Sequence, residues 1–170
     1  LGRLLVRIAR GRGVELAPPD RPAGATIDAA IEWLSSRGDE PLFTFVHLYD
    51  PHVPYAPPEE FARLHGEPRE GEFDWYALST AQRQKLVDDP EAVAHMRALY
   101  KGEISYADAQ LARLIEELKR SGRWEKTLVV LTSDHGEGLG SHGYWFDHGT
   151  FLYDEELHVP LILRFPNAQH

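Results

Sequence analysis

The sequence contains no cysteine, and this absence excludes several kinds of chemistry within its 170 residues. A disulfide, a thiolate metal site and a cysteine nucleophile all require that side chain, so this chain forms none of them by itself. No apolar run approaches the roughly 20 residues that cross a bilayer as a helix. The first residues also lack the apolar core and the cleavage site of a signal peptide.

Basic residues are outnumbered as well, with 18 Lys and Arg against 27 Asp and Glu. The resulting net charge of −9 argues against a nucleic-acid-binding surface, which needs clustered positive charge. The sequence does not begin with methionine, so we expect it to start within a longer protein.

What is present has the composition of an ordinary globular domain, with 42% hydrophobic and 26% charged residues. Apolar residues at helical spacing predict helices over residues 27–37, about 90–122 and 151–157. Apolar, β-branched and aromatic runs predict strands over residues 41–49, 127–132 and 159–165. Because helices and strands alternate along the chain, we predict an α/β fold with a mostly parallel sheet flanked by helices.

Two of the predicted strands run directly into residues that can carry chemistry. The run 127–132 is followed by Asp134 and His135, and the run 41–49 is followed by His52. Ligands bind at the carboxyl ends of strands in open α/β sheets, so we expect these side chains to gather at one edge. A carboxylate and an imidazole there suit a divalent metal ion.

Each of these residues also has an ordinary explanation. An Asp–His pair is common where a strand turns into a loop, and a loop histidine such as His52 needs no catalytic role. Glu137 and His142 are interpreted as residues that organise the glycine-rich loop. The aromatic side chains of Trp75 and Tyr76 are better explained by pinning their loop to the body than by lining a substrate site.

Four blocks of the sequence, in this order, resemble the sulfatase family of the alkaline phosphatase superfamily. The blocks are FVHLYDPHVPY (45–55), YKGEISYADAQLARLIEEL (100–118), TLVVLTSDHGEGLGSHG (127–143) and HGTFLYDEELHVPLILR (148–164). The resemblance runs from about residue 26 to residue 166. It implies that residues 1–170 are part of a sulfatase catalytic domain, with an incomplete fold of the alkaline phosphatase type.

The resemblance also implies roles for four residues. Asp134 and His135 match the family's metal-ligand pair, which usually holds calcium; zinc or manganese is the alternative. His52 matches the substrate-binding histidine of a His-x-Pro loop, and His148 stands where many relatives place a lysine that contacts sulfate. The family's nucleophile is a formylglycine made within a Cys/Ser-x-Pro-x-Arg motif. That motif and the paired aspartates near it have no counterpart here, so we expect them in a preceding part of the protein.

The implied function is hydrolysis of sulfate esters of small molecules or carbohydrates by the parent enzyme. Because calcium takes about 6–8 oxygen ligands, we expect this chain alone to bind metal weakly and to be inactive. Two alternatives stay open. One is a phosphodiesterase, phosphonate hydrolase or phosphoethanolamine transferase of the same superfamily, and the other is a truncated, non-catalytic module. The compartment is not determined, and a periplasmic or extracellular location is compatible with the resemblance.

Overall fold

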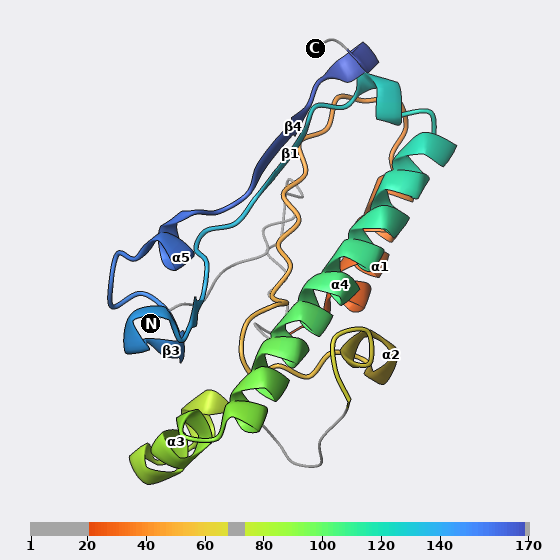
Figure 1. The fold of residues 1–170 in the computed structure, drawn as a ribbon. Coiled ribbons are helices and arrows are strands. Elements are labelled where there is room, and N and C mark those ends of the chain that lie inside the picture. Colours follow the sequence, from red (N-terminus) through yellow and green to blue (C-terminus); the bar gives the residue numbers. More distant parts are fainter. Residues whose placement is uncertain (1–20, 68–73, 169–170) are drawn as a thin grey trace.

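The computed structural model describes residues 21–67 and 74–168, and the helix α4 (Pro90–Arg120) is its longest element (Figure 1). Its 31 residues correspond to a length of about 46 Å. Pro90 occupies the first turn, and the Asp89 carboxylate accepts hydrogen bonds from the backbone N–H groups of Glu91 and Ala92. Lys119 and Arg120 lie in the last turn, where positive charge complements the helix dipole. These signals account for the predicted helix over about 90–122.

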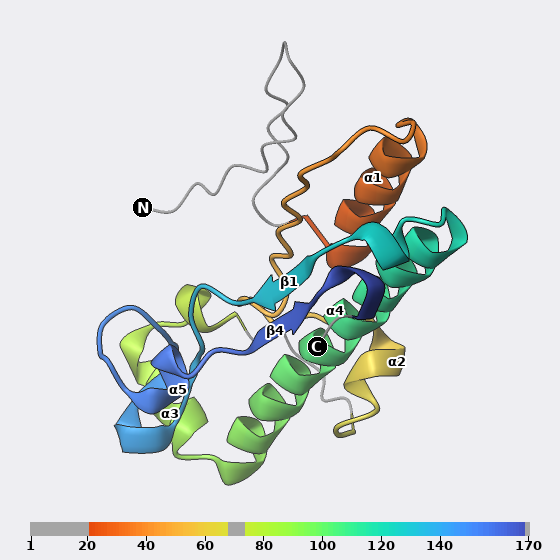
Figure 2. The same ribbon diagram turned by 90° about the horizontal axis from the view of Figure 1, so that it is seen from above.

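The helix α1 (Ala23–Ser35) packs beside α4 (Figures 1 and 2). Its buried side chains recur at helical spacing, at Ala23, Ile27, Ala30 and Leu34. This confirms the helix predicted over 27–37, although it begins four residues earlier, directly after Pro22. No helix among the described residues is both long and apolar enough to cross a membrane.

The hydrophobic core lies against the N-terminal half of α4. It contains the buried side chains of Val53, Tyr55, Trp75, Leu86, Val93, Met96 and Phe146. Three short elements surround it: α2 (Glu59–Ala62), the 3-10 helix η1 (Trp75–Ala77) and α3 (Thr80–Val87). The burial of Trp75 in this core agrees with the prediction that it pins its loop. Three further 3-10 turns are η2 (Trp124–Lys126), η3 (Ser141–Gly143) and η4 (Pro166–Ala168).

The strands form two small antiparallel ribbons. One pairs β1 (Val129–Thr132) with β4 (Leu161–Arg164), and the other pairs β2 (Gly138–Leu139) with β3 (Trp145–Asp147). The short helix α5 (Asp154–Leu157) precedes β4. Two predicted strands and the short helix are therefore present, near the predicted residues.

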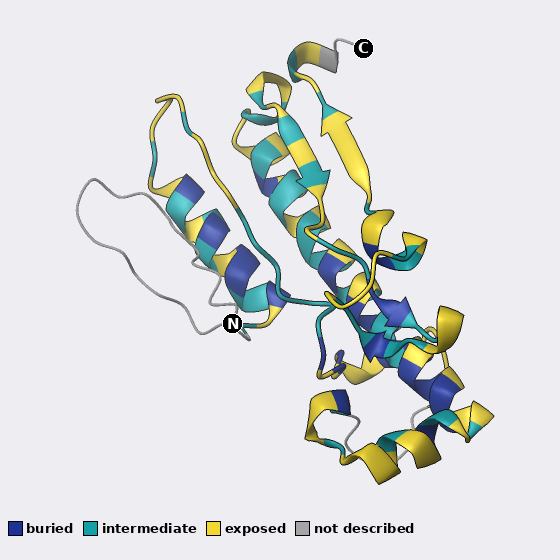
Figure 3. Ribbon diagram, turned by 90° about the vertical axis from the view of Figure 1, so that its left-hand side faces the viewer, coloured by how far each residue is buried: buried dark blue, intermediate teal, exposed yellow. Residues whose placement is uncertain are grey.

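The predicted mostly parallel sheet is not found in the described part of the chain, because both strand pairs are antiparallel. The segment 41–49, predicted as a strand, is in no ladder with the described residues. The side chain of Phe43 is 89% exposed, and Val130 and Leu163 are also exposed. The strand β4, which leads to the C-terminal end, is exposed over most of its length (Figure 3). Apolar alternation identifies residues that favour a strand, but it specifies neither the neighbouring strand nor its direction.

Candidate active site

Three histidines from separate parts of the chain come together. His52 follows the segment 41–49, His135 follows β1, and His148 follows β3. The rings of His135 and His148 are stacked with centroids 3.9 Å apart, and the centroid of His52 lies 5.0 Å from that of His148 and 6.5 Å from that of His135. The two polar loops that follow predicted strands therefore do meet, as the sequence indicated.

In two of these rings the Nδ1 atom is committed to a backbone carbonyl. Nδ1 of His52 lies 2.7 Å from the carbonyl oxygen of Val53, and Nδ1 of His135 lies 2.7 Å from that of Gly136. A carbonyl oxygen only accepts, so each Nδ1 carries a proton and donates it. The Nε2 atom of each neutral ring is then left with a lone pair for a ligand or a proton.

The third ring faces a carboxylate. Nδ1 of His148 is 3.3 Å from Oε1 of Glu137, and the hydroxyl of Tyr55 donates to Oε2 of the same carboxylate at 3.1 Å. Burial raises the pKa of Glu137 to about 7, although the Tyr55 hydrogen bond and the nearby imidazoles of His52 and His135 oppose this shift. Burial and the neighbouring His135 lower the pKa of His148.

A tyrosine and an aspartate lie at the edge of this cluster. The hydroxyl of Tyr76 donates to Oδ1 of Asp147 at 2.8 Å, and the same oxygen accepts the backbone N–H of His148 at 3.0 Å. The Tyr76 ring lies 6.5 Å from that of His52 and is 45% exposed. Burial and the Asp147 hydrogen bond raise the pKa of Tyr76. The favoured prediction for Tyr76, that it only pins its loop, is therefore incomplete, because its ring lies at the edge of the histidine cluster.

The loop that carries His52 is tied to both long helices. Oδ2 of Asp50 accepts the N–H of Ala23 in α1 at 2.8 Å, and Oε1 of Glu103 in α4 accepts the N–H of Ala56 at 2.7 Å. Glu103 is only 4% exposed, and its Oε2 is buried without a hydrogen-bond partner in the described residues. Burial and the neighbouring carboxyl of Asp50 together raise its pKa to about 8, against the opposing effect of the Ala56 N–H.

Gly136 lets the loop after β1 lie directly against α5. The N–H of Gly136 donates to the carbonyl of Glu156 at 2.8 Å, and that of Glu137 donates to the carbonyl of Glu155 at 3.1 Å. A Cβ atom at position 136 would lie 1.9 Å from the carbonyl oxygen of Glu155, which no side chain tolerates. On the far side of the loop, His142 pairs with Glu155 and so holds the structural place predicted for it.

Asp134 and His135 fit a divalent cation as two of its ligands. The Asp134 side chain is 69% exposed, and its Oδ1 lies 3.9 Å from Nε2 of His135. Two ligands bonded to one cation at about 2.0–2.6 Å can be about 4 Å apart, so this spacing is compatible with a shared ion. The described residues contain no cluster of three or more His, Asp or Glu side chains arranged to hold a metal. The pair therefore accounts for only part of a coordination sphere.

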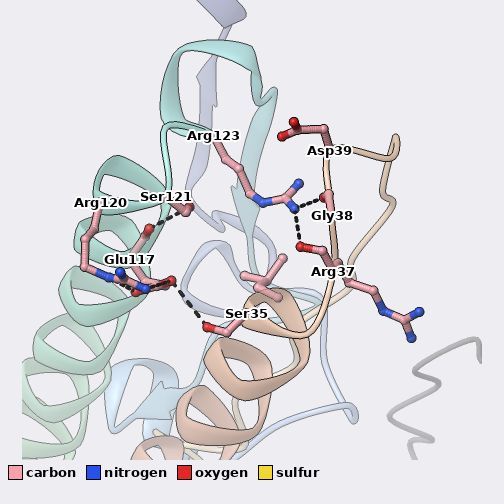
Figure 4. Close-up of a pocket in the computed structure, with 9 residues that line it drawn as sticks. Ser35, Arg37, Gly38, Asp39, Glu117, Arg120, Ser121 and Arg123 are labelled. Atoms are coloured by element: carbon pink, nitrogen blue, oxygen red, sulfur yellow. Dashed lines mark hydrogen bonds and ion pairs between the residues drawn. The ribbon is translucent and has the colours of Figure 1, made fainter.

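A cavity of about 260 Å³ lies elsewhere, between the C-terminal ends of α1 and α4 (Figure 4). Two of its charged side chains bond within the wall: Glu117 accepts from Arg120 and Ser35, and Arg123 donates to the carbonyls of Arg37 and Gly38. None of the three clustered histidines lines it. The cavity is therefore separate from the histidine cluster.

Comparison with known proteins places the chain in a family. Residues 21–170 match the family model described as Sulfatase. Human iduronate 2-sulfatase is 29% identical over 149 residues, which cover 74% of this chain and 27% of that protein. N-acetylglucosamine-6-O-sulfatase of Bacteroides thetaiotaomicron is 33% identical over 108 residues, which cover 64% of this chain and 17% of that protein.

Among solved structures, the phosphonate monoester hydrolase of Agrobacterium radiobacter is similar with a TM-score of 0.62 and 27% identity. The match covers 82% of this chain and 32% of that one. The chain thus spans less than a third of the length of each of these three relatives. The family match over nearly the whole chain, with the relatives and the fold, shows that this chain belongs to the sulfatase family of the alkaline phosphatase superfamily.

Proposed function

We propose that this chain supplies part of the active site of an enzyme that hydrolyses sulfate esters. The observation that carries the proposal is the convergence of His52, His135 and His148 beside Asp134, in a chain of the sulfatase family. Two relatives are named for sulfated sugars, iduronate and N-acetylglucosamine, which supports a carbohydrate sulfate as the substrate class.

In this proposal His52 and His148 bind the sulfate group and the ester oxygen. Nδ1 of His52 is held by a carbonyl, so its protonated ring presents Nε2–H to an oxygen that gains negative charge as the ester bond breaks. His148 lies 5.0 Å away, close enough for both rings to contact one tetrahedral sulfate. The proton on His52 can then pass to the departing alcohol.

Asp134 and His135 would hold a divalent cation, which the family resemblance suggests is calcium, with zinc or manganese as the alternative. When bound, such a cation would neutralise negative charge on the sulfate oxygens. The nucleophile of the family, formylglycine, has no counterpart in these 170 residues, so it is expected in another part of the protein.

The test is steady-state hydrolysis of an aryl sulfate by the full-length parent protein and by its single variants. Removing a general acid or a charge-stabilising group costs about 10²–10⁴-fold in rate, so H52A and H148A should each lower kcat/KM by at least 100-fold. His65 is a matched control, because it lies away from the cluster and bonds only to Ser105. H65A should leave kcat/KM within about twofold. Equal losses in all three variants would contradict the assigned roles.

A second candidate function is hydrolysis of a phosphonate or phosphate ester, and it is favoured by the similarity to a phosphonate monoester hydrolase. Matched aryl sulfate and aryl phosphonate substrates distinguish the two. A higher kcat/KM for the sulfate supports a sulfatase, and the reverse order supports the second candidate. Hydrolysis of neither ester by the native protein would favour the third alternative, a non-catalytic module.

A further inference from the structure

Glu137 is a buried carboxylate that joins three segments of the candidate site. Its side chain is 5% exposed, and it lies between the hydroxyl of Tyr55 and Nδ1 of His148. Tyr55 follows His52 by three residues, and Glu137 follows His135 by two. The carboxylate therefore touches, directly or through a neighbour, every loop that carries one of the three histidines.

Burying a carboxylate such as Glu137 for packing alone would lower the stability of the fold. Removing a carboxylate from water costs several kcal/mol unless its oxygens are hydrogen-bonded, and an apolar side chain of similar size would fill the same space without that cost. Both oxygens of Glu137 have partners, and those partners differ in kind. Tyr55 belongs to the core, packed edge-on against Phe146, whereas His148 belongs to the site.

We propose that Glu137 is a positioning residue for His148: Oε1 accepts the proton of Nδ1 and thereby fixes both the orientation of the ring and the nitrogen that carries the proton. Nε2, on the other side of Cε1, forms no hydrogen bond within the described residues and is left for the substrate. The catalytic consequence rests on the proposed function, whereas the position of the proton does not.

Glu137 is placed relative to His148 as a carboxylate that orients a catalytic imidazole is placed in other enzymes. An acceptor on Nδ1 keeps the proton of the neutral ring on Nδ1, so that Nε2 has a free lone pair. When Nε2 takes up a second proton, the same carboxylate stabilises the charged ring, and Nε2–H can then donate to a sulfate oxygen. Tyr55 makes the arrangement rigid, because its hydroxyl holds Oε2 and its ring is buried in the core. Without Glu137, His148 would keep its stacking on His135 but lose the interaction that distinguishes its two nitrogens.

The first test reads the protonated nitrogen of His148 by NMR of the native protein with nitrogen-15-labelled histidine. At about pH 8, wild type and E137Q should both carry the proton on Nδ1, since a carboxylate and an amide oxygen both accept. In E137L the proton should move to Nε2. The control Y55F removes the other hydrogen bond of Glu137 and should leave the proton on Nδ1.

The second test is kinetic and uses the same four proteins. Loss of a group that orients a ligand or a catalytic histidine costs about 10–100-fold, so kcat of E137L should fall by that factor while KM changes little. E137Q should recover most of the loss, and Y55F should lose stability more than kcat. The proposal is overturned if E137L keeps the proton on Nδ1, or if Y55F lowers kcat as much as E137L. If wild type shows no ester hydrolysis, the proposed function fails, and the NMR result alone decides the role of Glu137.

Discussion

The substitution Glu103→Gln should stabilise the protein at neutral pH, although it replaces a carboxyl group that accepts a backbone hydrogen bond. Glu103 lies in α4, and its Oε1 accepts the N–H of Ala56 at 2.7 Å. Its Oε2 is buried without a partner among the described residues, beside the carboxyl of Asp50. A glutamine keeps the acceptor for Ala56 and replaces the second oxygen by an N–H donor that can face Asp50.

The magnitude follows from the pKa of Glu103, which rises from 4.5 to about 8 on folding. Because the folded state holds this proton more tightly than the unfolded state, the free energy of unfolding falls as pH rises from about 4.5 to about 8. Each pKa unit corresponds to about 1.4 kcal/mol, so at pH 7, about 2.5 units above 4.5, the penalty is up to about 3 kcal/mol. We expect E103Q to recover about 1–3 kcal/mol at pH 7 and almost nothing at pH 4.5.

The assay is urea denaturation of wild type and E103Q at several pH values between 4.5 and 8.5. Glu116 lies on the same helix but is exposed and paired with Lys119, so E116Q serves as the control and should show no gain that increases with pH. A stabilisation by E103Q that is the same at pH 4.5 and pH 8 would refute the reasoning, and so would a destabilisation at pH 8.

Three further predictions concern packing and local structure. G136A places a Cβ atom 1.9 Å from the carbonyl oxygen of Glu155, so we expect the free energy of unfolding, measured by urea denaturation, to fall by about 1–3 kcal/mol. We also expect calorimetry to show weaker binding of Ca²⁺, because the loop that carries Asp134 and His135 is displaced. S79A removes the capping box that Ser79 forms with Gln82 at the start of α3. In urea denaturation it should lower the free energy of unfolding by about 1 kcal/mol, whereas S79D, which keeps a capping side chain, should retain most of the stability. M96A empties a fully buried core position and should cost about 2–5 kcal/mol; a loss below about 1 kcal/mol would mean that the core is not packed as described.

The helices were predictable from the sequence because their signals are local. The start of α4 follows from Asp89 and Pro90. Its buried face follows from apolar spacing only in part, because Ile104 is exposed whereas Glu103 and Glu117 are buried. The start of α1 was less well predicted. It begins at Ala23, before the first branched apolar residue, Ile27, because the N–H of Ala23 is satisfied by Asp50, 27 residues away. A tertiary hydrogen bond of this kind leaves no local pattern.

The direction of strand pairing was not predictable, since a strand's partners depend on the whole fold. The approach of His52 to His135 was expected because loops that follow parallel strands share one edge, yet the described strand pairs are antiparallel. The place of His148 beside them was suggested by the family resemblance and not by strand order. Glu137 was predicted only to organise the glycine-rich loop, and its hydrogen bonds to Tyr55 and His148 were not predicted. The first of these joins residues 82 positions apart, so no local pattern indicates it.

The candidate site is held together more by buried acids than by a sheet. A carboxylate has two acceptor oxygens and no donor, so it can tie together N–H or O–H groups from segments far apart in the chain. Glu137 joins Tyr55 to His148, and Glu103 holds the Ala56 N–H from within α4. The described sheets are only two-stranded ribbons, so the relative position of His52 and His148 depends on these two carboxylates and on the core between them. A substitution of Glu103 that removes the acceptor for Ala56 should therefore change the position of the His52 ring, even though Glu103 touches no reacting atom.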